Sequence, residues 1–204
     1  MNKPNYHIEM MNIIKDFEQA FPRKSLLLHI CCAPCASYCL ELLTKYFDVT
    51  LLYYNPNISD LDEYELRKTE VLRLVDYYGG KVKFLDTGWQ NEDFVAISKG
   101  YEDSKEGGPR CARCYDLRLG YTARKCKELG YDYFASTLSI SPHKNSILLN
   151  QIGQVCAERY GASYLPNDFK KNDGYKRSCL LSQQFGFYRQ NFCGCVYSKG
   201  SQKG

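Results

Sequence analysis

Residues 25–46, SLLLHICCAPCASYCLELLTKY, decide the fold of this chain. The apolar run at 26–30 is typical of a buried strand. Helical spacing at i, i+3, i+4 and i+7 follows it, at Cys39, Leu42, Leu43 and Tyr46. The strand-to-helix turn between them carries Cys31, Cys32 and Cys35. Open α/β sheets bind ligands at the carboxyl ends of their strands, where a nucleotide-binding protein has a glycine-rich loop. This stretch has thiols and no glycine, so the turn predicts thiol chemistry.

Outward from this stretch, strand patterns alternate with helical patterns. Further strands are predicted at residues 49–54, 81–85, 131–139 and 162–165. Helices are predicted at residues 1–21, 61–78, 93–99, 112–129, 145–160 and 174–188. Asp60 and Glu63 suit a capping box for the helix at 61–78. The alternation predicts an α/β, Rossmann-like, doubly wound and mostly parallel sheet flanked by helices.

The chain length favours a single domain over residues 1–204. Within it we expect an N-terminal helix in 1–24, a catalytic α/β domain in 25–198 and a flexible tail in 199–204. Residues 1–24 do not resemble a signal peptide, and no apolar run approaches the roughly 20 residues of a membrane span. We therefore expect a cytoplasmic protein with no membrane partner.

The formal charge of +4 does not by itself indicate a nucleic-acid partner, but its distribution is uneven. No acidic residue follows Asp173, whereas five basic residues do: Lys176, Arg177, Arg189, Lys199 and Lys203. This basic C-terminal region suits phosphate contacts, and it equally suits a solvated lysine tail.

Eleven cysteines are many for a cytoplasmic chain, where structural disulfides are rare and cysteine pairs bind metal or do redox work. Four of them are predicted to be small core residues, because they have helical spacing to apolar residues or lie beside them in the sequence: Cys39, Cys126, Cys156 and Cys179. The other seven form three groups, and these are the functional candidates.

Two of the groups suit one metal site. Cys31, Cys32 and Cys35 follow the first strand, and Cys111 and Cys114 form a C-x-x-C before the long helix. Together they predict a four-thiolate site, for which the spacing fits zinc and an iron–sulfur cluster equally well. A purely structural zinc site is less favoured, since a domain of this length can build its core without one.

The third group is Cys193-Gly194-Cys195. Two cysteines separated by one glycine can close a strained, readily reduced disulfide, which would store two electrons reversibly. The alternative is that both are additional metal ligands.

Several ordered segments of the chain resemble epoxyqueuosine reductase of the QueH type. They are YYNPNI (53–58), HICCAPCAS (29–37), RCARCYDLRL (110–119), TLSISPHKN (137–145) and GYKRSCLLSQQFGFYRQNFCGCVYS (174–198). The resemblance extends from about residue 26 to residue 198. It implies an enzyme of tRNA queuosine biosynthesis that reduces epoxyqueuosine to queuosine at the wobble position of tRNA, without cobalamin.

The resemblance also implies cofactors and site residues. A 4Fe–4S cluster is expected on Cys31, Cys32, Cys111 and Cys114, and a redox-active disulfide between Cys193 and Cys195. An additional iron beside the cluster is a further expectation, with Cys35 as its candidate ligand. The layout is similar to adenine-nucleotide hydrolase-like folds, but without their glycine-rich loop no ATP use is expected.

The chemistry adds two candidate proton donors and a set of candidate tRNA contacts. Removing an epoxide oxygen to leave an alkene takes two electrons and two protons. His143 and Tyr53 are the candidate proton donors. The electron donor is unidentified. Basic residues flanking the motifs are candidate backbone contacts, or else surface charges: Arg110, Arg113, Arg118, Lys144, Arg177 and Arg189. The aromatic pairs 53–54 and 187–188 suit stacking on a base, or the core. Two rival functions are a zinc-stabilised, non-catalytic RNA-binding module and a cluster-free thiol–disulfide oxidoreductase.

Overall fold

The computed structural model describes residues 4–17, 19 and 21–198, and these form an α/β structure around one parallel sheet. The sheet has four strands in the order β3-β2-β1-β4. Their bounds are β1 Lys24–His29, β2 Phe47–Tyr53, β3 Val82–Asp86 and β4 Tyr133–Ser136. The prediction of a Rossmann-like, doubly wound parallel sheet is confirmed.

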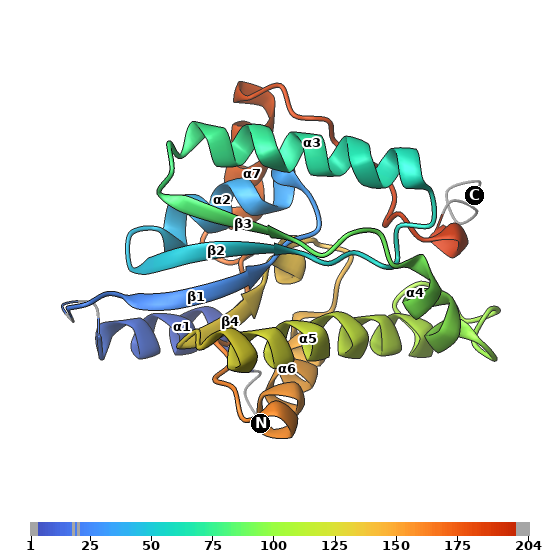
Figure 1. The fold of residues 1–204 in the computed structure, drawn as a ribbon, viewed down its shortest axis with the longest axis horizontal. Coiled ribbons are helices and arrows are strands. Elements are labelled where there is room, and N and C mark those ends of the chain that lie inside the picture. The colour runs from blue at the N-terminus through green and yellow to red at the C-terminus, as the bar shows by residue number, and fades with distance from the viewer. Residues whose placement is uncertain (1–3, 18, 20, 199–204) are drawn as a thin grey trace.

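Helices cover both faces of the sheet (Figure 1). The α2, α3 and α7 helices lie on one face, and α5 and α6 lie on the other. The helical bounds are α1 Tyr6–Lys15, α2 Ala33–Leu43, α3 Leu61–Tyr77, α4 Asn91–Ser98, α5 Pro109–Leu129, α6 Ser146–Tyr160 and α7 Gly174–Gln184, with short 3-10 turns η1 Thr137–Ile140 and η2 Val196–Ser198.

The core follows from the alternation of side chains along β1. Leu26 and Leu28 are buried in the cluster that includes α2 and α3, whereas Leu27 is buried in the cluster that includes α5 and α6. Successive strand residues point to opposite faces, so an uninterrupted apolar strand needs helices on both sides. At the start of α3, the Asp60 side chain accepts a hydrogen bond from the Glu63 backbone N–H, as the capping pattern predicted.

Several predicted element boundaries are wrong. The helix predicted at 1–21 ends at Lys15, with Asp16 as its C-cap. The strand predicted at 131–139 ends at Ser136 and continues as η1, and the helix predicted at 174–188 ends at Gln184. The strand predicted at 162–165 is reduced to one bridge between Phe134 and Tyr164. The bridge is made by the Phe134 N–H to the Ser163 carbonyl and the Leu165 N–H to the Phe134 carbonyl, and the next N–H in register, that of Asn167, donates to Asn150 Oδ1 instead, so the ladder ends there.

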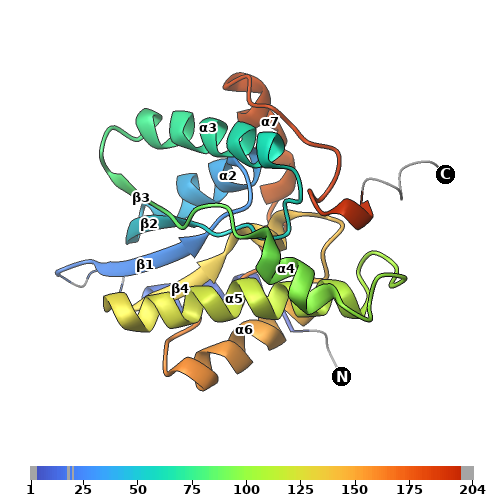
Figure 2. The ribbon, with the colours of Figure 1, turned by 45° about the vertical axis from the view of Figure 1, so that its right-hand side comes forward.

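The strand order places a topological switch point between β1 and β4. The chain runs from β1 to β2 and β3 on one side and then returns to β4 on the other side of β1. At the carboxyl ends of the strands lie the Cys31–Cys32 turn after β1 and residues 141–145 after η1. The start of α5 and the C-terminal η2 reach the same end of the molecule (Figure 2). Ligands of doubly wound sheets bind at this place.

The two ends of the chain bear on the domain prediction. A helix is present within 1–24, as predicted, at Tyr6–Lys15. The predicted tail at 199–204 lies outside the described residues, as do Lys199 and Lys203 of the basic region. Among the described residues, the helices are too short or too polar to cross a membrane.

Candidate functional site

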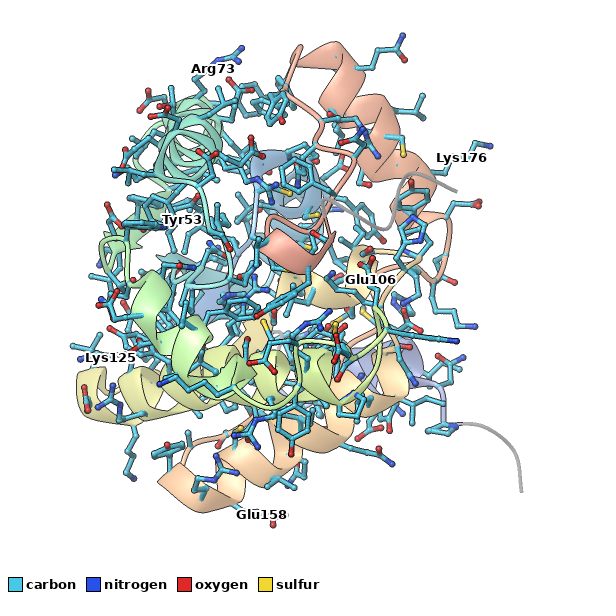
Figure 3. All side chains as sticks on the ribbon, turned by 90° about the vertical axis from the view of Figure 1, so that its right-hand side faces the viewer. Tyr53, Arg73, Glu106, Lys125, Glu158 and Lys176 are labelled. Carbon is cyan, nitrogen blue, oxygen red and sulfur yellow. The ribbon has the colours of Figure 1, made fainter. Side chains whose placement is uncertain are left out.

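A cavity of about 580 Å³ opens at the switch point. It is lined from β1–α2 by Cys31 and Cys35, from α5 by Arg118, from the loop before α6 by Lys144, and from the C-terminal segment by Cys193. A second cavity of about 20 Å³ shares three of these residues and adds Cys111, Cys114 and Cys195. Figure 3 looks onto this end of the molecule, and sulfur atoms gather near its centre, beside η2.

Cys31, Cys32 and Cys35 form a compact thiol trio. Their sulfur atoms all lie within 4.8 Å of one another, and the sulfurs of Cys31 and Cys32 are 3.7 Å apart. Cys32 is the N-cap of α2, and Pro34 in the first turn turns the chain into the helix, which brings Cys35 back toward Cys31. The trio could hold a metal ion, and it includes the cysteine predicted to bind an additional iron.

The three thiols of the trio differ in acidity. Hydrogen bonds from Cys32 and Cys35, with help from the charges of Arg118 and Lys144, lower the pKa of Cys31 well below its usual range. The hydrogen bond that Cys32 makes to Cys31 raises the pKa of Cys32 to about 12. Cys31 is therefore the most acidic thiol of the trio, since the pKa of Cys35 is raised as well.

Cys111 and Cys114 lie in the first turns of α5, which begins at Gly108 and Pro109. At spacing i, i+3 their side chains lie on one face of the helix. Cys111 accepts a hydrogen bond from the Gly107 backbone N–H at 3.2 Å, and burial raises the pKa of Cys114 to about 11.

The four predicted cluster ligands lie in two pairs at this end of the molecule. Cys31 and Cys32 belong to the compact trio, whereas Cys111 and Cys114 line the smaller cavity with Cys193 and Cys195. Among the described residues, the trio is the only group of three or more potential ligand atoms within 4.8 Å. The ligand set of four therefore stays a prediction.

Arg118 is the buried cation that both pairs border. Its side chain is 1% exposed, and it interacts electrostatically with Cys114, Cys31 and Cys193. Its guanidinium donates to Asn55 Oδ1 at 2.6 Å and to His29 Nε2 at 3.2 Å. No carboxylate within 4.0 Å pairs with it in the part of the chain that the structure describes, so thiolates are its available counter-charges.

The thiols present fit a thiolate-held metal group. Thiolates are the ligands that select zinc and iron–sulfur clusters. A single tetrahedral ion with metal–sulfur bonds of about 2.3 Å holds its sulfurs roughly 3.8 Å apart, close to the Cys31–Cys32 separation. A 4Fe–4S cluster takes four cysteines, and the Cys31–Cys32 and Cys111–Cys114 pairs bordering one buried guanidinium supply that number together with a compensating charge.

The remaining candidate residues have distinct environments. Cys193 lines both cavities and Cys195 lines the smaller one, and both are free thiols. His143 is exposed and lines the larger cavity. Tyr53 is fully buried, donates its hydroxyl to the Tyr64 carbonyl at 2.9 Å, and lines neither cavity. Figure 3 shows Tyr53 away from the centre of this end. The geometry therefore favours His143 over Tyr53 as a proton donor, and both assignments stay predictions.

The cysteines predicted to be core residues are mostly so. Cys39, Cys126 and Cys156 are fully buried, which confirms the argument from helical spacing. Cys179 is only half-buried. It lies on α7 next to Leu180, whose side chain is exposed to solvent.

Some candidate tRNA contacts turn out to be structural. Arg110 is buried over the Tyr197 ring at 4.0 Å, and Arg118 is buried among the thiols, so neither offers its charge to a phosphate backbone. Arg177 pairs with Glu41 at 2.6 Å. Arg189 is exposed and lines the larger cavity.

The aromatic pairs are likewise used in packing. Tyr54 is buried against the Tyr121 ring, with centroids 3.8 Å apart, and Phe187 is buried beside Phe185. For Tyr54 and Phe187 the structure therefore confirms the core alternative rather than stacking on a base.

Sequence reasoning named Arg118 and Lys144 only as candidate tRNA contacts and did not place Arg118 among the thiols or Lys144 beside Cys193. Arg118 lies four residues after Cys114, and this i, i+4 spacing on one helix face was the signal that could have placed it at the thiols. No comparable local signal exists for Lys144, which meets Cys193 from 49 residues away.

Comparisons with known proteins give a consistent result. The family model for epoxyqueuosine reductase QueH matches residues 26–201. The chain is 44% identical over 204 residues to epoxyqueuosine reductase QueH of Streptococcus pyogenes, covering 98% of this chain and 80% of that protein. It is 38% identical to the Staphylococcus epidermidis protein of that name, over 98% of this chain and 87% of the relative. For the Thermotoga maritima protein of the same name, the identity is 35% over 85% of this chain and 90% of the relative.

Proposed function

This chain belongs to the epoxyqueuosine reductase QueH family, and we propose that it reduces epoxyqueuosine in tRNA with a 4Fe–4S cluster and the Cys193–Cys195 pair. It is an oxidoreductase of tRNA queuosine biosynthesis that converts epoxyqueuosine to queuosine at the wobble position of tRNA. The proposal covers the means of the reduction: the cluster, the redox pair, independence from cobalamin and an external electron donor.

The observation that carries the proposal is that seven thiols gather at the switch point. Three line the larger cavity and four the smaller, with Cys193 lining both, and Cys32 completes the trio with Cys31 and Cys35. Cys31, Cys32, Cys111 and Cys114 would hold the cluster, and Cys35 would bind an additional iron. A bound cluster supplies one-electron transfer at this place. The larger cavity, of about 580 Å³, is within the usual range for small-ligand sites and suits one modified base extruded from the anticodon.

The reaction sets the requirements for the protein groups. Both bonds from the epoxide oxygen to carbon break, a carbon–carbon double bond forms, and the oxygen leaves as water after taking up two protons and two electrons. Oxidation of Cys193 and Cys195 to a disulfide releases two electrons, so one cycle of the pair matches one turnover. His143, exposed at the cavity wall, would deliver a proton to the leaving oxygen.

The decisive experiment is anaerobic reconstitution of the full chain with iron and sulfide, without cobalamin, followed by reaction with epoxyqueuosine-containing tRNA and mass spectrometry of the nucleosides. We expect a brown protein that forms queuosine. A colourless protein that binds zinc and forms none would contradict the cluster and favour a zinc-stabilised RNA-binding module.

A double variant tests the redox pair separately. The Cys193→Ser, Cys195→Ser protein should keep its iron and fail in multiple turnover, because the two electrons of each turnover then have no store. If it loses iron instead, the two cysteines are metal ligands and the storage role is wrong.

A further inference from the structure

Glu106 brings the only carboxylate to the walls of the two cavities. It lines both of them, and among the described residues no other aspartate or glutamate lines either. Figure 3 shows Glu106 near the centre of the thiol end. In the part of the chain that the structure describes, its carboxylate makes no ion pair within 4.0 Å and no hydrogen bond. A negative group thus faces the cavities without a partner from the protein.

The rest of the larger cavity is rich in positive charge. Four cationic side chains line it: Arg67, Arg118, Lys144 and Arg189. Glu63 matches the charge of Arg67 at 2.7 Å. Within residues 4–17, 19 and 21–198, the other three cations have no carboxylate within 4.0 Å. This excess of positive charge attracts a polyanion such as tRNA, and a carboxylate on the same wall weakens that attraction. Glu106 therefore suits a different, cationic group of the substrate.

Backbone hydrogen bonds fix the position of Glu106. The Gly108 N–H donates to the Lys105 carbonyl at 3.0 Å, which makes Glu106 the first central residue of a β-turn. Gly107 is the second, with φ +81, a conformation that favours glycine. The Gly107 N–H donates to Cys111 Sγ at 3.2 Å, so the turn is tied to the start of α5. The carboxylate is therefore held at the thiols and not on a free loop.

Gln190 adds a second acceptor without a partner. Its side chain lines the larger cavity, and its Oε1 atom is buried with no hydrogen-bond partner among the described residues. Buried carbonyl oxygens of folded proteins normally accept a hydrogen bond. The larger cavity thus offers two unused acceptors, which suit a ligand that carries N–H or O–H donors.

The chemistry of the substrate supplies such a group. Epoxyqueuosine is a 7-deazaguanine nucleoside whose 7-aminomethyl nitrogen is bonded to an epoxide-bearing cyclopentane ring. This nitrogen is a basic secondary amine, and it carries a positive charge near neutral pH. The base and the hydroxyl groups are neutral and the phosphates are negative, so the ammonium is the only cation of the nucleotide. It is bonded to the ring carbon next to the epoxide, so a group that binds it also fixes the epoxide.

We propose that Glu106 is a substrate-binding residue whose carboxylate pairs with the secondary ammonium of epoxyqueuosine and so holds the epoxide at the thiol end. The inference rests on the proposed use of the larger cavity by the extruded base. Hydrogen bonds between opposite charges are stronger than neutral ones, and unmodified guanosine has no cation at this place. The pair therefore also selects the modified nucleoside.

The test compares two RNA probes that differ in one charge. Both are the same anticodon stem-loop, with 7-aminomethyl-7-deazaguanine or 7-cyano-7-deazaguanine at the wobble position. The aminomethyl probe carries the cation, the cyano probe is neutral, and neither has an epoxide to reduce. Binding to the full, iron-reconstituted chain is measured by fluorescence anisotropy at one salt concentration, because RNA affinity depends on salt. The wild-type protein should bind the aminomethyl probe about tenfold more tightly than the cyano probe.

Glu106→Gln keeps the shape of the side chain and removes its charge. The preference for the aminomethyl probe should fall to nearly one in this variant, and kcat/KM for epoxyqueuosine-containing tRNA should fall about tenfold at unchanged iron content. Glu106→Asp, which keeps the carboxylate on a shorter side chain, should retain part of the preference. Because Glu106 is exposed, neither change should impair folding.

A matched control removes the same charge from the same loop. Glu102 is exposed and lines neither cavity. Glu102→Gln changes the net charge as Glu106→Gln does, so it has the same general effect on attraction of RNA. It should keep the wild-type preference for the aminomethyl probe.

The outcomes separate this inference from the proposed function. If queuosine forms but the wild-type protein binds both probes equally, or Glu106→Gln keeps the preference, the role of Glu106 is wrong and the proposed function stands. Loss of iron in Glu106→Gln would make the carboxylate a metal ligand and overturn the inference. If the preference depends on Glu106 but the reconstituted protein forms no queuosine, the binding role stands and the proposed means of reduction fails.

Discussion

Replacing Arg118 by Met should lower the free energy of unfolding mainly when metal is bound. Arg118 is 1% exposed, among three thiols, and its hydrogen bonds go to Asn55 and His29. Burial and Arg118 itself lower the pKa of His29 to about 3, so His29 is neutral at pH 7 and offers no counter-charge. The negative charge that compensates Arg118 must therefore come from thiolates, and metal binding creates thiolates by displacing their protons.

The size of the effect can be worked out for the two states. Without metal, Cys31 is the thiol of lowered pKa beside Arg118, whereas Cys114 and Cys32 are protonated at pH 7, since their pKa values are raised to about 11 and about 12, so metal binding adds anionic thiolates to this site. Losing two hydrogen bonds and the Cys31 interaction is then partly offset by no longer burying a guanidinium, for a net cost of about 1 kcal/mol. With metal, a unit charge pair at 4 Å is worth about 4 kcal/mol at a dielectric constant of 20, and breaking a buried pair costs about 3–5 kcal/mol.

Arg118→Met should thus remove about 3 kcal/mol of metal-dependent stabilisation. For a chain of this length, 1 kcal/mol shifts Tm by about 2–4 °C, so the rise in Tm on iron loading should shrink by roughly 6–12 °C. The measurement is anaerobic thermal unfolding before and after reconstitution, with iron content determined in parallel. Lysine keeps the charge but has fewer hydrogen-bond donors. The rise in Tm of Arg118→Lys on iron loading should therefore fall between that of the wild-type protein and that of Arg118→Met.

Arg159→Met provides the control. Arg159 pairs with Asp116 at 3.0 Å on the surface, where such pairs contribute about 0–1 kcal/mol. Arg159→Met should therefore change Tm by the same amount with and without metal. If Arg118→Met gains as much Tm on loading as the wild-type protein does, the thiols around Arg118 do not become anionic on metal binding, and the electrostatic argument is refuted.

Three further predictions concern the ligands and the packing. Cys111→Ala should lower iron content and abolish queuosine formation, and full iron loading with normal turnover would remove it from the ligand set. Cys126→Ala and Cys156→Ala should each cost about 1 kcal/mol of unfolding free energy and leave the absorption spectrum of the cluster intact, because both are core thiols; iron loss in either would contradict this. Two helical glycines should respond oppositely in denaturant unfolding. Gly153→Ala should destabilise by about 1–3 kcal/mol because a Cβ there overlaps the Tyr164 ring, whereas Gly120→Ala, whose Cβ would have 3.6 Å to the nearest atom, should be neutral or gain up to about 1 kcal/mol; equal effects would refute the packing.

Much of the fold could be read from local patterns. The apolar run before Cys31 predicted β1, and the spacing of Cys126 and Cys156 predicted that both would be buried. The C-x-x-C predicted that Cys111 and Cys114 would offer two thiols from one turn, but it was placed before the long helix, whereas the structure has both inside the first turns of α5. Each of these properties depends on the geometry of a few neighbouring residues, which periodicity reports directly.

Local patterns failed where an element depended on a partner elsewhere. The strand predicted near Tyr164 pairs only once, because the next N–H in register, that of Asn167, donates to Asn150 Oδ1 rather than to β4. Tyr54 was a candidate for base stacking, but its ring meets Tyr121 from α5. Arg110 was a candidate for a phosphate contact, but its charge is buried over Tyr197 from the other end of the chain.

The sequence by itself determined which residues carry thiols, that three of the thiols follow β1, and that the sheet is parallel and doubly wound. Only the tertiary structure decided that Arg118 is buried between Cys31 and Cys114, and that Lys144 meets Cys193. The reason is physical. The crossover from β3 back to β4 brings the ends of β1 and β4 together at the switch point, and the C-terminal segment then closes over them. Contacts between segments so far apart in the chain leave no periodic signal in either segment, so their charges and thiols meet only in the folded protein.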